Sequence, residues 1–133
     1  MTYLLDTNTC ITFLRDRNSA VARKLAVTDP EEVCLCSIVK AELYYGAHRS
    51  AQPDHSLAIL RQFIGGFHSL PFDDHAAEVY GQVRGELARS GNLIGPNDLL
   101  IASIAIAHQV VLVTHNTDEF RRVGGLGIED WHG

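Results

Sequence analysis

The sequence lacks the features that mark a membrane or secreted protein. No run of apolar residues approaches the roughly 18 that a membrane-spanning helix needs, and the long apolar stretch 99–107 is interrupted by Ser103. The first residues, MTYLLD, contain neither a basic leader nor a cleavable apolar segment. We therefore expect a cytoplasmic protein with no membrane association.

Cysteine is scarce, and its pattern disfavours both a disulfide framework and a thiolate metal site. The three cysteines, Cys10, Cys34 and Cys36, are odd in number and form no CxxC pair, so we expect buried free thiols. The seven histidines are scattered, and none is paired with another at a ligand spacing. We expect them at the surface or at helix ends rather than in a catalytic site.

Cations are also in the minority. The sequence has 11 Lys and Arg against 16 Asp and Glu, and a net charge of −5 does not by itself indicate a nucleic-acid-binding protein. Nine of these cations are arginine, however, which is suited to bidentate contact with phosphate. The length of 133 residues, 46% of them hydrophobic, predicts one folded domain over residues 1–133.

What the sequence does contain is an alternation of short β-like runs and amphipathic helical runs. This alternation predicts an α/β fold in which a central parallel sheet of four to five strands has helices on both faces. The expected strands are 2–5, 33–36, 67–70, 110–114 and 126–131. The expected helices are 7–17, 18–28 (capped by Asn18 or Ser19), 38–48 (capped by Ser37), 54–64, 73–89, a helix opened by Asp98, and 116–120.

Acidic side chains fall where these elements meet one edge of the predicted sheet. Asp6 ends the first strand, Glu42 lies in the helix after the second, and Asp98 opens a helix. Asn116 and Glu119 follow the apolar strand 110–114. Because the carboxyl ends of parallel strands collect functional groups, we expect these residues to converge. Carboxylates a few ångströms apart repel one another, and oxygen ligands without thiolates favour Mg²⁺ or Mn²⁺.

Each acid also has a structural interpretation. Asp6 is a suitable N-cap, and Asp98 and Glu119 suit the first turn of a helix, where acids complement the helix dipole. Glu42 could be a solvated helix residue, although Lys40 and Arg49 lie at the wrong spacing for a helical ion pair. A single convergence accounts for all of these positions together.

Five segments around these acids form ordered motifs: LLDTN (4–8), SIVKAELYYGA (37–47), PNDLLIASIA (96–105), LVTHNTDEF (112–120) and VGGLGIEDW (123–131). Together they resemble the motifs of PIN-domain ribonucleases, and most of all those of the VapC toxins of type II toxin–antitoxin systems. The resemblance covers nearly the whole chain. It implies a Rossmann-like, three-layer α/β/α PIN fold and an Mg²⁺- or Mn²⁺-dependent endoribonuclease.

By motif, the resemblance places Asp6, Glu42 and Asp98 as the catalytic acids and metal ligands. Many relatives carry Asp where this chain has Asn116, so either Asn116 or Glu119 is the fourth catalytic residue. Three hydroxyls are expected to contact the ligands or a phosphate, although simple helix capping explains them equally well. These are the hydroxyls of Thr7, Ser37 and Thr114.

The resemblance also implies partners. The expected substrate is RNA, with a transfer RNA, including the initiator species, as the first choice. A VapB-type antitoxin is expected to neutralise the toxin and to supply the contacts to operator DNA, and the toxin is expected to form a homodimer. Hydrolysis by this route leaves a 5′-phosphate and a 3′-hydroxyl, whereas a histidine-based ribonuclease gives a cyclic phosphate.

Two other functions compete with this one. A phosphatase of the haloacid-dehalogenase type also begins with an apolar strand that ends in Asp, but it requires a second Asp where this chain has Asn8. A PIN fold that serves only as a protein-interaction module would not need three mutually repelling acids. We expect neither.

Overall fold

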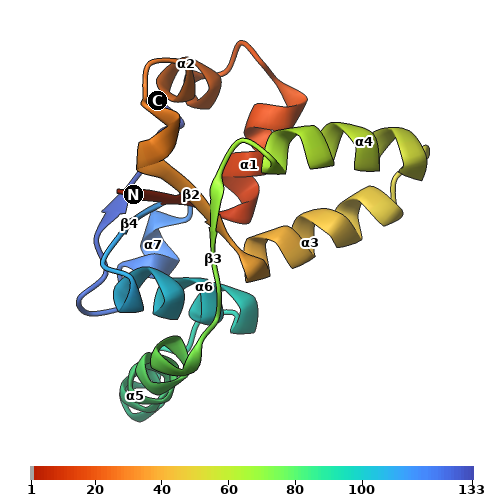
Figure 1. Cartoon of the computed structure of the whole chain (residues 1–133). Coiled ribbons are helices and arrows are strands. Elements are labelled where there is room, and N and C mark those ends of the chain that lie inside the picture. The colour runs from red at the N-terminus through yellow and green to blue at the C-terminus, as the bar shows by residue number, and fades with distance from the viewer. Residues whose placement is uncertain (1) are drawn as a thin grey trace.

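A five-stranded parallel sheet forms the centre of the computed structural model, which describes residues 2–133 (Figure 1). The strand order is β3-β2-β1-β4-β5, so β1 lies in the middle, and Tyr3 pairs with Val33 on one side and Val111 on the other. This confirms the predicted parallel sheet. The strands are β1 (Tyr3–Leu5), β2 (Val33–Cys36), β3 (His68–Leu70), β4 (Val111–Val113) and β5 (Ile128–Glu129).

Helices cover the sheet on both sides, which gives the expected three layers. Figure 1 shows α1 and α2 on one side of the strands and α5 and α6 on the other. Pro30–Glu32 forms a short 3-10 helix before β2. The α-helices are α1 (Thr7–Arg15), α2 (Ala20–Ala26), α3 (Ser37–His48), α4 (Pro53–Ile64), α5 (Asp74–Ser90), α6 (Pro96–Ala107) and α7 (Thr117–Phe120).

The inner strands are apolar at nearly every position because they are covered on both faces. All four residues of β2 are buried, and both of its cysteines are free thiols, as expected. Burial raises the pKa of Cys34 to about 12 and that of Cys36 to about 11. Since the thiolate is the reactive form, these cysteines act as packing residues.

The structure decides one helix start that the sequence left open and corrects two others. Ser19 is the cap of α2, and its hydroxyl accepts from the Ala22 N–H. Helix α6 begins at Pro96 rather than at Asp98, because proline suits the first helical position, where no N–H is needed. Ser37 is the first residue of α3 and not its cap, since β2 runs directly into the helix.

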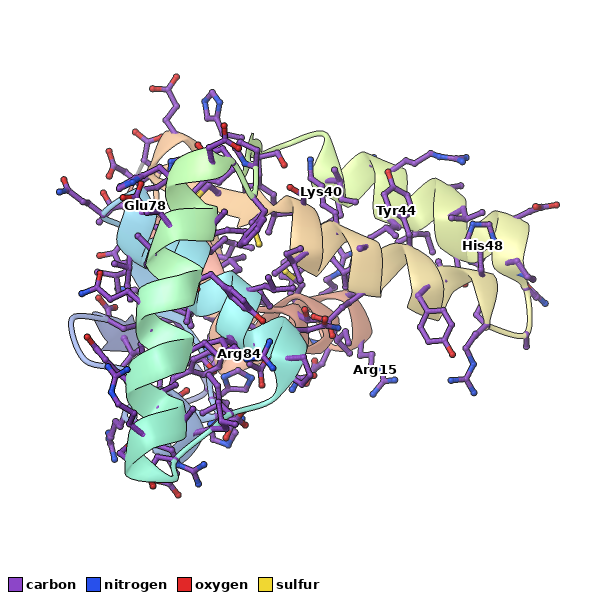
Figure 2. The ribbon with its side chains drawn as sticks, turned by 90° about the horizontal axis from the view of Figure 1, so that it is seen from below. Arg15, Lys40, Tyr44, His48, Glu78 and Arg84 are labelled. Atoms are coloured by element: carbon purple, nitrogen blue, oxygen red, sulfur yellow. The ribbon has the colours of Figure 1, made fainter. Side chains whose placement is uncertain are left out.

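Helices α3 and α4 form an antiparallel pair that extends away from the sheet, as the views of Figure 1 and Figure 2 agree. Leu43 of α3 and both Leu57 and Leu60 of α4 are buried, so the pair carries its own apolar contacts. Tyr45 on the same pair is 64% exposed. Across residues 2–133, no helix combines the length and the apolar character needed to span a membrane.

Candidate active site

Asp6 lies at the centre of the sheet, at the carboxyl end of β1. Its backbone N–H donates to the carbonyl oxygen of Val113 (3.0 Å), which ties the end of β1 to β4. Its side chain caps α1 by accepting from the Thr9 N–H (2.8 Å), and it is 4% exposed. The capping interpretation of Asp6 is therefore correct. The cap occupies one carboxylate oxygen, and among the hydrogen bonds of residues 2–133 none uses the other.

Glu42 is held by contacts from two other helices. The Thr7 hydroxyl donates to Glu42 Oε1 (2.6 Å), and the Asn97 side-chain amide donates to Glu42 Oε2 (3.4 Å). Thr7 begins α1 and Asn97 lies in the first turn of α6, so Glu42 joins these helices to α3. Among the residues described, no ion pair links Glu42 to a basic side chain.

Asp98 and Glu119 meet beside Gly95. The Gly95 N–H donates to Glu119 Oε1 (2.8 Å). A Cβ atom at Gly95 would lie 3.5 Å from Glu119 Oε1 and 3.6 Å from Asp98 Oδ2, so both carboxylates border the same backbone position. The Asn116 side-chain amide donates to Glu119 Oε2 (2.5 Å). Asp118, in contrast, has a 98% exposed side chain and faces Arg121.

The acids of this group act on one another's pKa values. Burial first, and then the charges of Glu119, Asp6 and Glu42, raise the pKa of Asp98 to about 7. Burial alone would raise the pKa of Glu119 as well. Hydrogen bonds from Gly95, Asn116 and Asp98 outweigh burial and lower that pKa. Of these two acids, Asp98 is therefore the one that takes up a proton. Without a cation, the four carboxylates are not all ionised at neutral pH.

The donor set fits a hard divalent cation. All four acids offer carboxylate oxygens, and the thiols nearest to them are buried with raised pKa values. Oxygen ligands of this kind suit Mg²⁺ or Mn²⁺ better than Zn²⁺. A hollow of about 220 Å³ opens next to the group and is lined by Glu42, Gly95, Pro96, Asn97 and Asp98.

The three predicted hydroxyls have different surroundings. Thr7 contacts Glu42 directly, whereas the Thr114 hydroxyl accepts from the backbone N–H of Asn116 (3.0 Å) and so shapes the loop after β4. The Ser37 hydroxyl donates to the Leu70 carbonyl (3.3 Å) toward β3. Among the hydrogen bonds of residues 2–133, none joins the Ser37 hydroxyl to one of the carboxylates.

Two further hollows differ in their relation to the acids: one adjoins Glu42, and the other touches none of them. A groove of about 260 Å³ adjoins Glu42 and is otherwise mainly apolar, with Ile11, Leu43 and Leu60 among its lining residues. A hollow of about 290 Å³ next to Phe13 and Phe63 has no carboxylate in its lining. We place the chemistry at the smaller acidic hollow, because charge and hydrogen-bonding groups converge there.

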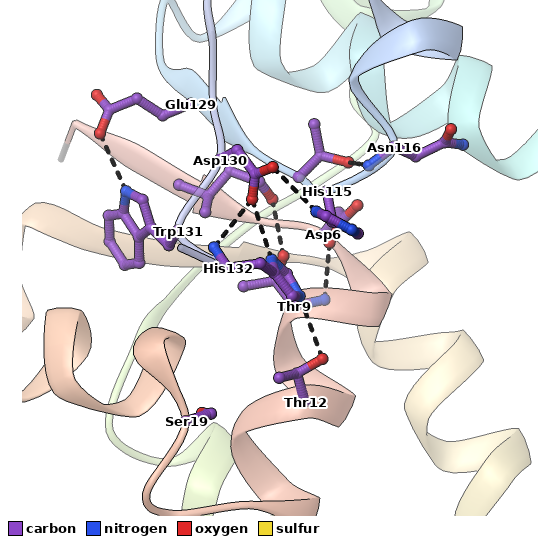
Figure 3. Close-up of polar contacts among 12 residues, drawn as sticks. Asp6, Thr9, Thr12, Ser19, His115, Asn116, Glu129, Asp130, Trp131 and His132 are labelled. Carbon is purple, nitrogen blue, oxygen red and sulfur yellow. Dashed lines mark hydrogen bonds and ion pairs between the residues drawn. The ribbon is translucent and has the colours of Figure 1, made fainter.

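Sequence reasoning missed one group of polar residues. His115, Asp130 and His132 come together at the same sheet edge, although the histidines were expected at the surface or at helix ends with none paired as ligands (Figure 3). The pKa of the Asp130 carboxyl lies below its ordinary value. Its slight burial would raise this pKa, but the carboxylate accepts hydrogen bonds from the His132 backbone N–H and from both histidine rings, and these lower it. Only the pairing of β4 with β5 creates this proximity, and no spacing in the sequence indicates it.

Comparison with known proteins agrees with the geometry. The PIN domain model matches residues 3–126. The chain belongs to the PIN-domain family. It is 40% identical over 129 residues to the tRNA(fMet)-specific endonuclease VapC of Shigella flexneri, with 97% of each chain covered. It is 35% identical to Ribonuclease VapC2 of Haemophilus influenzae, again with 97% of each chain covered.

Solved structures place it in the same branch of the PIN domains. The chain superposes on the crystal structure of DNA-bound VapBC from Salmonella typhimurium with a TM-score of 0.93 at 39% identity, covering 98% of each chain. The predicted PIN fold and membership of the VapC ribonucleases are thereby confirmed, and nothing supports the phosphatase reading. Nucleases of the PIN family are generally dependent on divalent metal ions, which agrees with the carboxylate set.

Proposed function

We propose that this chain is the toxin of a type II toxin–antitoxin system and acts as an Mg²⁺-dependent endoribonuclease. The observation that carries the proposal is that Asp6, Glu42 and Glu119, from three other segments, lie near enough to Asp98 to act on its charge, beside a hollow that Glu42 and Asp98 line. Structural capping explains Asp6 but not the raised pKa of Asp98, which reflects burial and the other three charges.

Asp6, Asp98 and Glu42 would hold the ion, and Mn²⁺ satisfies the same ligand chemistry as Mg²⁺. When bound, the ion supplies a water of lowered pKa and stabilises the charge that develops on the scissile phosphate. We assign Glu119 as the fourth carboxylate. Asn116 serves a positioning role, because its amide already donates to Glu119.

The chain's own groups prepare this site before any substrate arrives. The Thr9 N–H orients Asp6, and the Thr7 hydroxyl orients Glu42. With both carboxylates held, less reorganisation is needed when phosphate charge develops. Hydrolysis then leaves a 5′-phosphate and a 3′-hydroxyl without using the substrate's 2′-hydroxyl.

The substrate we propose is a transfer RNA, with the initiator species as the first candidate. The support is the printed specificity of the Shigella flexneri relative for tRNA(fMet). Exposed arginines suit a phosphate backbone: Figure 2 labels Arg15 of α1 and Arg84 of α5, and Arg84 donates to the Tyr80 hydroxyl (2.7 Å). Few cations are needed, because structured RNA is recognised largely by its shape.

We further propose that one PIN domain, residues 1–133, pairs with a VapB-type antitoxin in the cytoplasm. The VapBC complexes among the similar structures support this partner, and contacts to operator DNA then come from the antitoxin. A basic side chain from the antitoxin would enter the acidic hollow, and the neighbouring apolar groove at Glu42 would hold the adjoining segment. We expect the toxin itself to form a homodimer, as is usual for this family.

The test compares the purified chain with its Asp6→Asn variant on total tRNA, with Mg²⁺ or with EDTA. Asparagine keeps an oxygen that accepts from the Thr9 N–H, so the α1 cap survives while the charge is lost. Asp118→Asn, which removes an exposed charge from α7, is the control and should cleave normally. We expect Mg²⁺-dependent cleavage with 5′-phosphate ends that Asp6→Asn lacks. Cyclic phosphate ends, or full activity in Asp6→Asn, would refute the site.

A further inference from the structure

A second cluster of ligand-type side chains lies outside the carboxylate group. His115 Nδ1 is 2.9 Å from Asp130 Oδ2, and His132 Nδ1 is 3.2 Å from Asp130 Oδ1. One ligand atom from each of the three residues lies within 4.8 Å of the others. Figure 3 shows both rings directed at the Asp130 carboxylate, and the rings stack with centroids 4.6 Å apart.

Regular structure holds these three residues in place. The Thr114 N–H donates to the Glu129 carbonyl (2.9 Å), so the carboxyl ends of the parallel strands β4 and β5 are joined. His115 and Asp130, which follow these ends, therefore lie side by side. The His132 backbone N–H donates to Asp130 Oδ1 (2.9 Å), which folds the chain back over the carboxylate. His132 is therefore presented by a short turn, not by a free chain end.

The second nitrogen of His132 has a partner of its own. His132 Nε2 is 3.2 Å from the Thr12 hydroxyl of α1. Histidines that bind metals commonly have their other ring nitrogen fixed by such a contact, which selects the tautomer and the ring orientation. An ion would displace the Nδ1 proton that now faces Asp130; the ring proton would then lie on Nε2 and be donated to the Thr12 hydroxyl, which leaves Nδ1 as the ligand atom.

We propose that His115, Asp130 and His132 form a binding site for a borderline divalent transition metal ion, with Zn²⁺ as the principal candidate. Two imidazoles and one carboxylate are a ligand set that Zn²⁺ accepts with three protein ligands and an open position. Ligand atoms about 2.0–2.2 Å from one ion lie roughly 3.3–3.6 Å apart in a tetrahedron. Here the two ring nitrogens lie 2.9 and 3.2 Å from the two Asp130 oxygens, and one ligand atom from each residue lies within 4.8 Å of the others, so small side-chain shifts would bring all three onto one ion. The His115 side chain is 67% exposed, so an ion and its water reach the site from solvent.

This site differs chemically from the carboxylate group. The acids around Asp98 offer only oxygen and suit Mg²⁺, whereas the two imidazoles favour Zn²⁺ even when Mg²⁺ is abundant. The two sites also share structural elements, because Asn116 follows His115 directly and Thr12 lies in the helix that Asp6 caps. A bound ion would tie the turn at 130–132 to the end of β4 and to α1.

The experiment titrates the untagged, metal-free chain with Zn²⁺ in millimolar Mg²⁺ and follows binding by calorimetry and thermal unfolding. We expect one Zn²⁺ per chain and a higher unfolding temperature. His115→Gln and His132→Gln should each weaken Zn²⁺ binding roughly tenfold or more, and Thr12→Val should weaken it about tenfold. His75→Gln removes an exposed histidine outside the cluster and is the matched control.

An Asp98→Asn background separates this proposal from the proposed nuclease. Zn²⁺ binding that persists in Asp98→Asn but is lost in His115→Gln supports the new site even if the chain cleaves no RNA. Zn²⁺ binding that is lost in Asp98→Asn and unchanged in His115→Gln would place the ion among the carboxylates and overturn the proposal. Absence of Zn²⁺ binding by the unsubstituted chain would overturn it too. Because His115 is largely exposed, its glutamine variant remains informative even if His132→Gln misfolds.

Discussion

Replacing Asp98 by asparagine is expected to stabilise the metal-free protein at neutral and alkaline pH. The carboxyl of Asp98 is half-buried beside Glu119, and its pKa is raised to about 7 from an ordinary value of 3.8. An asparagine amide can donate to Glu119 as the protonated acid does, but it never ionises. The variant thus mimics the protonated site at every pH.

The sign and the pH window follow from linkage. Below about pH 4, Asp98 is protonated in both the folded and the unfolded chain, so wild type and variant should be equally stable. Between about pH 4 and 7 the unfolded chain loses this proton before the folded chain does, and the stability of the wild type falls as pH rises. Above about pH 7 the full difference is present. Allowing for solvent screening of a half-exposed group, we expect on the order of 1–2 kcal/mol in favour of Asp98→Asn.

The assay is thermal unfolding in EDTA across pH 5 to 8, repeated with Mg²⁺. For a chain of this size, ~1 kcal/mol corresponds to an unfolding-temperature shift of roughly 3–5 °C. Mg²⁺ at about 100 times its Kd would add about 2.7 kcal/mol to the wild type. The variant has lost a ligand and should gain much less. The order of stability should therefore reverse when Mg²⁺ is added at pH 8.

Asp118→Asn is the control, since it removes the same charge from an exposed position of α7 and should leave the pH profile unchanged. The reasoning fails if Asp98→Asn is no more stable than wild type at pH 8 without metal. It fails equally if the difference stays constant down to pH 5, because a constant offset would reflect packing and not ionisation.

Three other outcomes are expected. Thr7→Val should lower kcat roughly tenfold by releasing Glu42, and Thr7→Ser should restore it, as single-turnover cleavage would show; equal rates in both variants would contradict the positioning role. Gly46→Glu should weaken antitoxin binding in a titration while RNA cleavage continues, because a Cβ at Gly46 meets no atom within 4 Å and the side chain projects into the apolar groove. Arg15→Gln should weaken tRNA binding and reduce its dependence on salt concentration; an unchanged salt slope would show that Arg15 contacts no phosphate.

The architecture could be predicted because the pattern that specifies it is local. Apolar four-residue runs such as VCLC indicate strands buried on both faces, and the helices between them require parallel pairing. Helix ends were less predictable. Proline at position 96 sets the start of α6, and the direct passage from β2 into α3 removes any need for a cap at Ser37.

The sequence predicts which acids form the site, but it does not predict the contacts between them. Glu42 is joined to the residue after Asp6 by the Thr7 hydroxyl, which the sequence presents equally well as a helix cap. Our assignment of Glu119 rather than Asn116 as the fourth carboxylate rests on the Asn116 amide that donates to Glu119, a contact that the sequence cannot place. The histidine cluster was missed for a related reason: His115 and Asp130 are neighbours only through the pairing of β4 with a two-residue β5.

The strand order explains why acids so distant in sequence reach one place. The chain runs outward from β1 to β2 and β3, and then returns to the other side of β1 to form β4 and β5. The crevice at such a reversal lies beyond the carboxyl end of the first strand, where Asp6 stands. Glu42 enters it from the β2 side, and Glu119 enters it from the β4 side. Because this geometry concentrates negative charge, either a divalent ion or an inserted basic side chain relieves it, and the two would compete for the same space.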